Sequence, residues 1–533
     1  MIKDNKSQSW KTLDWKSFQK RVFSLQRRIY KAVCAGDKGQ ANNLQKLLLR
    51  SYAARMIAIR QVTQLNAGKK TAGIDGKKAL KPKERFELAK TLKANQKTWK
   101  HSKLREIPIP KKDGSTRMLK VPTIADRAWQ CLIKLALDPA HEATFHARSY
   151  GFRVGRSAQD AQKILQINLN SNANGIDKRV IELDIEKCYA LRARYANDRI
   201  AHKAILDQLI APQSVKQGIF HCLKAGTSPE FPDQGTPQGG VVSPLLANIA
   251  LNGIEAIHPS VRYADDMIFF LKPKDEAEKV LDKIKTFLAA RGMKISEKKT
   301  KVTATTSGFD FLGWNFKVQS NGKFKSRPSK DNYLAMRKKV KAIVNCPNIS
   351  AEEKSKKLAP IIRGWRNYHK HCAMDKARDS LWAINHRTWK VFNKEESLNK
   401  YQTDNLVLAA FPTVSYSENK FVNVKGGKSP YDGDLTYWGE RNSKLYDGTV
   451  AETLKKQHHS CGHCGLKLTS EQRVHLHHID CNHKNWKRAN LMAVHESCHD
   501  YIHMAQRETK TQLSRKLGAG KPARPDFNER CGG

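Results

Sequence analysis

At residues 261–270 the chain reads Val261-Arg262-Tyr263-Ala264-Asp265-Asp266-Met267-Ile268-Phe269-Phe270. Two adjacent aspartates interrupt a segment that is otherwise largely apolar and strand-like. Two carboxylates at a tight turn between buried strands are electrostatically costly, because like charges repel and desolvation favours their neutral forms. A divalent cation removes that cost, so the pattern predicts a metal site. An exposed Asp-Asp turn in a β-hairpin is the alternative interpretation.

A third carboxylate upstream extends this pattern. Asp184 closes the apolar run Val180-Ile181-Glu182-Leu183, which places it at a strand end of the same predicted α/β body. Three aspartates at strand ends can hold two Mg²⁺ ions that activate an attacking 3′-hydroxyl and stabilise the leaving pyrophosphate. Between them lies the loop Gly235-Thr236-Pro237-Gln238-Gly239-Gly240, whose glycines let backbone approach a nucleotide closely.

The net charge indicates the class of partner. Among 533 residues, 97 Lys and Arg oppose 50 Asp and Glu, for a formal net charge of +47. A compact chain with this charge repels itself unless a polyanion compensates, so nucleic acid is the expected partner. The length suggests roughly three or four domains. No apolar run reaches about 18 residues and no apolar signal region follows Met1, so we expect a soluble intracellular protein without a membrane partner.

Cysteine and histidine are concentrated near the C-terminus. The eleven cysteines are scattered except for Cys461, Cys464, Cys481 and Cys498, a distribution that does not indicate a disulfide framework. The pairs Cys461/Cys464 and His495/Cys498 each enclose two residues, the spacing of a closed structural Zn²⁺ site. His499 and His503 are four apart, which on a helix puts both imidazoles on one face.

Motif order carries a resemblance that covers nearly the whole chain. The motifs, in order, are Asn66-Ala67-Gly68-Lys69-Lys70-Thr71-Ala72-Gly73-Ile74-Asp75-Gly76, Ile107-Pro108-Ile109-Pro110-Lys111-Lys112-Asp113-Gly114, Ser149-Tyr150-Gly151-Phe152-Arg153, the glycine-rich loop, Tyr263-Ala264-Asp265-Asp266, Glu297-Lys298-Lys299-Thr300 and Phe311-Leu312-Gly313-Trp314. Together they resemble the reverse transcriptases encoded by group II introns. The resemblance implies a multidomain α/β and α protein: a right-hand polymerase with fingers and palm, an α-helical thumb, a small DNA-binding segment and a zinc-containing ββα-metal (HNH) nuclease domain.

The expected domains follow the composition and this resemblance. They are a basic helical extension at 1–62, the reverse transcriptase fingers and palm at 63–326, the thumb or maturase domain at 327–396, a DNA-binding domain at 397–454, the HNH domain at 455–508 and a basic tail at 509–533. In the extension, residues Trp15 to Val33 place apolar side chains at helical spacing. One helix face is predicted to pack and the other to meet phosphates, with an ordinary solvated face as the alternative.

The resemblance also implies roles for single residues of the polymerase. Asp184, Asp265 and Asp266 would be catalytic metal ligands for two Mg²⁺ ions. Lys111 and Arg117 would clamp the triphosphate, Arg153, Gln238 and Tyr263 would bind substrate, and Tyr189 would lie under the sugar. Arg363, Trp365 and Arg366 combine charge with an aromatic ring, which suits contact with intron RNA. The alternative is an amphipathic thumb helix with Trp365 in its core.

The histidines of the C-terminal domain resemble those of HNH nucleases. That resemblance implies one divalent ion such as Mg²⁺ on His477, His499 and His503, with His478 as the general base that deprotonates water. Imidazole suits this role at neutral pH. Asn490 would orient the turn. A zinc finger that only binds DNA is the alternative, but it would not need the additional histidine pairs.

One departure from the family pattern lies close to the predicted catalytic metals. Ala190 to Asn197 looks like an insertion directly after Tyr189, which either extends a helix or displaces that tyrosine. The leading hypothesis is a multifunctional protein of the prokaryotic cytosol that acts on group II intron RNA, target DNA and deoxynucleoside triphosphates as polymerase, maturase and endonuclease. A maturase without polymerase activity, and an endonuclease on an inactive polymerase scaffold, are the alternatives.

Overall fold

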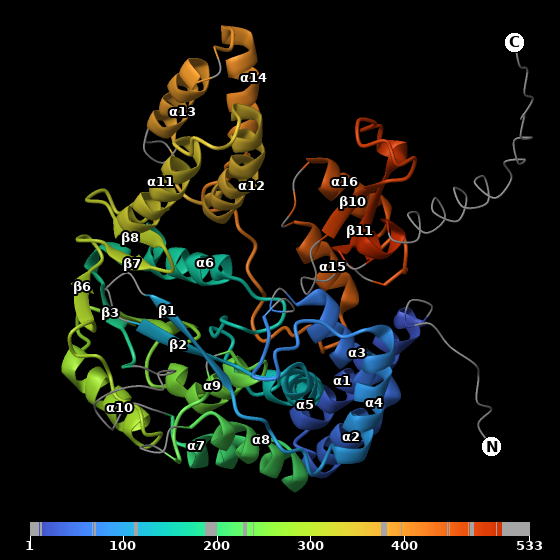
Figure 1. Cartoon of the computed structure of the whole chain (residues 1–533). Coiled ribbons are helices and arrows are strands. Elements are labelled where there is room, and N and C mark those ends of the chain that lie inside the picture. The colour runs from blue at the N-terminus through green and yellow to red at the C-terminus, as the bar shows by residue number, and fades with distance from the viewer. Residues whose placement is uncertain are drawn as a thin grey trace, which may run out of the picture. The chain divides into compact units, whose positions relative to one another are not determined.

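The chain folds into two compact units, Met1–Gly433 and Asp434–Gly533 (Figure 1). The structure, a computed structural model, describes residues 10, 13–66, 68, 71–110, 116–186, 200–227, 232–237, 239–374, 381–395, 397–444, 446, 448–466, 468, 474–496 and 498–503. Within these residues no helix combines the length and apolarity needed to cross a bilayer. The predicted insertion Ala190 to Asn197 and the tail 509–533 lie outside the described residues.

A four-stranded antiparallel sheet with the order β4-β5-β3-β6 forms the centre of the first unit. Its strands are β3 (Arg179–Leu183), β4 (Ser260–Tyr263), β5 (Asp266–Leu271) and β6 (Lys301–Ala304). Side chains alternate between its two faces, as a strand requires: Phe269 enters one apolar core, and its neighbours Ile268 and Phe270 enter another. Apolar cores therefore pack against both faces of the sheet.

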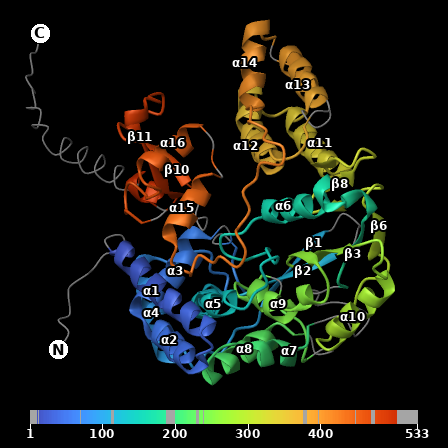
Figure 2. The same cartoon turned by 180° about the vertical axis from the view of Figure 1, so that it is seen from behind.

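Helices cover both faces of this sheet (Figures 1 and 2). One core joins it to α5, α9 and α10, and the other joins it to α6 and to the three-stranded sheet β7-β8-β9. The elements are α5 (Ile124–Glu142), α6 (Ala158–Leu169), α7 (His202–Gln208), α8 (Gln213–Ala225), α9 (Ser243–Leu251), α10 (Ala277–Ala289), β7 (Phe309–Phe311), β8 (Trp314–Val318) and β9 (Phe324–Pro328). A hairpin of β1 (Arg105–Pro110) and β2 (Thr116–Val121) precedes α5.

The N-terminal helices share a core with α5. They are α1 (Trp15–Cys34), α2 (Lys38–Arg50), α3 (Tyr52–Arg60) and α4 (Pro82–Asn95). Val22 and Ile29 of α1 are buried, and Trp15, Phe18, Leu25 and Val33 pack against the same core. The predicted packing face of this helix is therefore present, and its remaining positions carry most of its Lys and Arg.

Four helices follow the sheets and enclose a core of their own, and Figure 1 shows them side by side. They are α11 (Lys330–Val344), α12 (Ala351–His369), α13 (Trp382–Glu395) and α14 (Lys400–Ala410). Ser350 caps α12 by accepting a hydrogen bond from the Glu353 backbone N–H. The first three of these helices lie in the region 327–396 that the sequence predicts to be helix-rich. The fourth, α14, extends the bundle to Ala410, beyond the predicted end of that domain.

The second unit is small. It comprises α15 (Leu435–Ser443), α16 (Gly448–Lys456), the antiparallel strands β10 (Val474–His478) and β11 (Leu491–His495), and helical residues 498–503. Its described apolar core contains Leu454, Leu468, Ala493 and Val494, together with Cys461 and Cys498. Two of the six buried side chains of this core are thus predicted metal ligands, and partly buried residues such as Val474 and Met492 pack against them.

Candidate active site and metal centres

The three predicted metal-binding aspartates, Asp184, Asp265 and Asp266, meet at one end of the central sheet. Asp184 directly follows β3, and Leu183 pairs with Met267 of the antiparallel strand β5, which places Asp184 opposite Asp266 by extension of the register. Tyr263 pairs with Asp266 across the hairpin, so that Ala264 and Asp265 form the turn. The two adjacent aspartates therefore do lie at a β-hairpin, as the alternative to a metal site supposed. This hairpin lies next to a third carboxylate, that of Asp184.

The negative charges of the three carboxylates at this end of the sheet repel one another. The pKa of Asp266 rises to about 7, because neighbouring atoms remove water from the carboxyl group and because Asp265 and Asp184 repel its negative charge. Asp266 is nevertheless exposed at the start of β5, whose other residues are buried. Lys299 opposes the shift and forms an ion pair with Asp184, with 3.2 Å between Nζ and Oδ2. Oxygen ligands that repel one another suit Mg²⁺.

Lys299 is a residue of the site to which sequence reasoning assigned no role. It lies 115 positions from Asp184 and belongs to the Glu297–Thr300 motif. The backbone N–H of Ser296 donates to the Asp184 carbonyl at 2.8 Å, which holds the two segments together. The sequence offered one signal for Lys299: this lysine lies in a motif that contributes to the family resemblance.

Several predicted substrate-binding residues cannot be placed. Lys111, Tyr189 and Gln238 lie outside the described residues, as does the side chain of Arg117. Tyr263 is described and half-buried, and its pKa is raised by burial and by the charge of Asp266. Contact between these residues and a nucleotide stays a prediction.

Arg153 is engaged inside the protein. Its guanidinium forms a bidentate pair with Glu142, at 2.9 and 2.7 Å, and Nη1 also donates to the carbonyls of His146 and Ser149. Arg156 contacts the same carboxylate at 3.2 Å. In this arrangement Arg153 holds the loop between α5 and α6, because nearly all of its donors are used by the protein, and it offers little to a nucleotide.

The predicted RNA-binding residues of α12 point in different directions. Arg363 is exposed. Trp365 packs against the core of the bundle and donates from Nε1 to Asn332 at 2.7 Å, while Arg366 donates to the carbonyls of Phe411 and Pro412. Trp365 therefore corresponds to the core position considered as the alternative, and of the three only Arg363 offers its charge freely at the surface.

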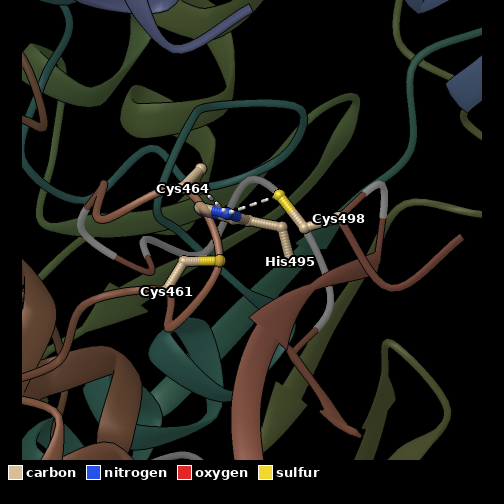
Figure 3. A group of neighbouring side chains, drawn as sticks. All are labelled: Cys461, Cys464, His495 and Cys498. Carbon is tan, nitrogen blue, oxygen red and sulfur yellow. Dashed lines mark hydrogen bonds between the residues drawn. The ribbon is translucent and has the colours of Figure 1, made fainter. Parts of the chain in front are cut away.

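In the second unit, the four predicted zinc ligands converge. One ligand atom from each of Cys461, Cys464, His495 and Cys498 lies within 4.8 Å of the others. Figure 3 shows the His495 ring between Cys464 and Cys498, with its Nδ1 at 3.4 and 3.9 Å from the two sulfur atoms. Three thiols and one imidazole are the donor set of a closed structural Zn²⁺ site, so the residues present fit that ion.

A second cluster in the same unit contains histidines alone. Ring nitrogens of His477, His499 and His503 lie within 4.8 Å of one another, and the Nε2 atoms of His499 and His503 are 3.2 Å apart. Burial and the neighbouring imidazoles, His503 first among them, lower the pKa of His499 to about 4. Neutral imidazoles fit a divalent ion, and a donor set without carboxylate favours a transition metal over the Mg²⁺ named above.

His478 and Asn490 flank the connection between β10 and β11. His478 ends β10, next to His477, and its buried Nε2 atom has no hydrogen-bond partner among the described residues. The side chain of Asn490 accepts from the Asp480 backbone N–H at 2.9 Å and donates to the Asp480 carboxylate at 2.8 Å. These bonds tie the two sides of the connection between β10 and β11.

Comparison with known proteins gives three matches to family models. Residues 10–92 match the N-terminal domain of reverse transcriptase, 109–316 match reverse transcriptase (RNA-dependent DNA polymerase), and 334–404 match the group II intron maturase-specific domain. These ranges contain the central sheet with its aspartates and most of the helical bundle.

Similar whole proteins are also known. Maturase-like protein 1 of Euglena gracilis is 34% identical over 458 residues, which cover 85% of this chain and 96% of that protein. Maturase-like protein 1 of Euglena longa is 33% identical, over 77% of this chain and 89% of that protein. The group II intron-encoded protein LtrA of Lactococcus lactis subsp. cremoris is 24% identical, over 49% of this chain and 56% of that protein.

Proposed function

Because this chain belongs to the group II intron reverse transcriptase/maturase family, we propose that it copies RNA into DNA and assists the splicing of a group II intron RNA. The observation that carries the polymerase is the convergence of Asp184, Asp265 and Asp266 at one end of the central sheet. The proposed domains are fingers and palm at 63–326 and the maturase thumb at 327–396, with α14 continuing the bundle beyond that bound. The substrates are intron RNA as template and deoxynucleoside triphosphates.

In polymerisation the three aspartates bind and orient the reacting groups. Two Mg²⁺ ions, when held by these carboxylates, supply activation of the primer 3′-hydroxyl and charge stabilisation of the leaving pyrophosphate. Lys299 keeps Asp184 in place through their ion pair, and Tyr263 borders the same turn. Lys111, after β1, and Arg117, in β2, would neutralise the triphosphate, and the arginine can make bidentate contacts.

Primer extension tests the polymerase. The full chain, with a DNA primer on an RNA template, Mg²⁺ and deoxynucleotides, is compared with Asp265→Ala. We expect extension by the unmodified chain and its loss in the variant, because one of three ligands for the two ions is removed. Absence of extension in both would favour a maturase and nuclease whose polymerase fold only holds RNA.

We also propose that the second unit is a DNA endonuclease of the HNH type. Two separate clusters of possible ligands support this assignment over a zinc finger that only binds DNA. Cys461, Cys464, His495 and Cys498 would hold structural Zn²⁺, and His477, His499 and His503 would hold a divalent ion at which a DNA phosphodiester is bound. His478 would take the proton of the attacking water, and Asn490 would keep the turn in position.

These activities combine in intron mobility. Excised intron RNA inserts into one strand of a DNA target, the endonuclease cuts the other strand, and the polymerase extends the new 3′-hydroxyl on the inserted RNA. Primer extension and cleavage of target DNA, both measured on the same preparation, test whether the two activities belong to separate sites. We expect His478→Ala to extend primers without cutting DNA and Asp265→Ala to cut DNA without extending primers. If His478→Ala still cuts, the endonuclease assignment is wrong.

A further inference from the structure

The turn that carries the catalytic aspartates has an unusual backbone. Ala264, its first residue, has a φ of 60°, the left-handed region that favours glycine. The two-residue turn Ala264-Asp265 joins β4 to β5, and Asp265 is not among the residues of positive φ. A positive φ at the first position alone is typical of a type II′ turn, where glycine is preferred. An alanine there is held by its surroundings.

Arg262 supplies one part of those surroundings. Its side chain is completely buried and its Nε pairs with Oε1 of Glu255, which is also buried. Nη1 donates to the Ala264 carbonyl at 3.2 Å and to Oδ1 of Asn248 at 2.9 Å. A buried guanidinium requires a charged partner, and Glu255 provides it, so the remaining donors are fixed in direction.

Asn248 and Gly151 supply the opposite part. Asn248, on α9, donates from Nδ2 to the Gly151 carbonyl at 2.8 Å. Gly151 lies so close that a Cβ atom there would be 2.3 Å from the Ala264 nitrogen. The neighbouring backbone is also paired, since Tyr150 N–H donates to the Arg262 carbonyl at 2.9 Å. The Ala264 peptide is therefore enclosed between the Ser149–Arg153 motif and the Arg262 side chain.

We propose that Arg262 and Asn248 are positioning residues for DNA synthesis: through the Ala264 carbonyl and Gly151 they hold the left-handed turn that aims Asp265 and Asp266. The inference rests on the proposed polymerase function. Neither side chain is placed on substrate or metal. A small rotation of the turn would move both carboxylates together, because they are consecutive residues and leave the same peptide segment.

Glycine at position 264 provides a direct test of this role. Glycine adopts a positive φ without steric cost, so it should need less support from Arg262. The variants are Arg262→Lys, Ala264→Gly and the double variant. Arg262→Lys keeps the positive charge near Glu255 but removes the planar fork that reaches Ala264 and Asn248 at once. Gln45→Leu is the control, because it removes a buried side chain of α2 that donates to the carbonyls of Ala136 in α5 and of Ile210.

The measurement is single-turnover incorporation of one deoxynucleotide by the full chain, normalised to the concentration of active sites. We expect Arg262→Lys to lower the maximal rate about tenfold or more at saturating nucleotide, with primer–template affinity unchanged. Ala264→Gly in that background should recover a substantial part of the rate, whereas Gln45→Leu should lower thermal stability without lowering the rate per active site.

Two results would overturn the inference while leaving the polymerase intact: a rate for Arg262→Lys close to that of the unmodified chain, or a loss that Ala264→Gly does not relieve and that simply follows the melting temperature. A chain without incorporation in its unmodified form would overturn the polymerase proposal itself, and with it this positioning role.

Discussion

At the Ala264-Asp265 turn, carboxylates that suit metal binding lower the stability of the metal-free fold. Asp266 lies beside two other carboxylates and is partly shielded from water, and its raised pKa records the free-energy cost of ionising it there. Carboxylates that repel one another in this way are retained where a cation completes the site. The same cost should be measurable in the metal-free protein.

Asp266→Asn should separate stability from activity. Removal of one negative charge relieves the repulsion, so the melting temperature of the metal-free chain is expected to rise, while Mg²⁺ should stabilise the variant less than the unmodified chain. Primer extension should fall by about 100-fold or more, because a ligand for the catalytic ions is lost. Asp207→Asn, an exposed aspartate on α7, is the control. A variant that melts no higher in EDTA would contradict the electrostatic account.

His141 predicts a dependence of stability on pH. It is buried in α5, its Nε2 accepts from the Ile210 N–H at 3.3 Å, and burial, with a smaller effect of Lys216, lowers its pKa to about 3. Below its ordinary pKa of 6.5 the unfolded chain binds a proton that the folded chain excludes. The contribution is therefore complete above pH 6.5 and is lost as pH falls toward 3, by about 1.4 kcal/mol per pH unit.

Urea unfolding followed between pH 7 and 5 checks the sign. The free energy of unfolding should decrease as the pH is lowered. This decrease should be less steep for His141→Gln, whatever the stability of that variant at pH 7. His221→Gln, at an exposed position, serves as the control and should keep the original slope. Equal slopes for His141→Gln and the unmodified chain would show that another group governs this range.

At the scale of elements, helix α13 presents an exposed aromatic ring in line with lysines, whereas Trp365 of α12 packs against the bundle core. Trp365 and Arg366 of α12 are committed to Asn332 and to backbone carbonyls, whereas Trp382 of α13 is 63% exposed and stacks on His386, with ring centroids 5.5 Å apart. Lys390 and Lys394 continue the same line at four-residue intervals and are exposed. An aromatic platform followed by cations suits a stacked base and its phosphates.

Trp382→Ala should therefore weaken RNA binding more than any single substitution in α12. Loss of one stacking contact predicts a decrease in affinity of about tenfold in a gel-shift assay with structured intron RNA. Tyr401→Ala is the control, since Tyr401 is an even more exposed aromatic residue, at 75%, on the neighbouring helix α14. Equal losses in the two variants would argue against a specific platform on α13.

At the scale of the whole molecule, the two units differ in what stabilises them. The first has large cores on both faces of its central sheet, while the second has a small described core that includes two cysteines of the proposed zinc site. A module whose small core includes metal ligands is expected to obtain much of its folding free energy from the metal. Stability of the two units should respond separately to chelation.

Removal of zinc should unfold the second unit locally. Cys461→Ser is expected to lose one equivalent of zinc and to expose the amides of β10 and β11 to hydrogen exchange, with primer extension retained. Mass spectrometry measures both the metal content and the exchange. Cys34→Ser, at an exposed cysteine in α1, is the control. Unchanged zinc content in Cys461→Ser would rule out the assignment of this site.

The sequence alone predicted the polymerase resemblance, which the matches to reverse transcriptase and maturase models confirm. Spacing predicted the zinc ligands, and the resemblances implied the other ligand sets. These features are local: two aspartates after a strand, or two cysteines three positions apart, have the same chemical meaning in any surroundings. Motif order then placed the aspartates in one site, since a known fold fixes how such segments meet.

Only the tertiary structure decided which charged and aromatic side chains remain available. Arg153 is used by Glu142, Trp365 by Asn332, and Arg262 by Glu255 and the catalytic turn. Lys299 reaches Asp184 across 115 positions. Residue type determines which interactions a side chain can make, but its partner depends on which distant segments pack beside it, and that packing minimises the free energy of the whole fold rather than of any local segment.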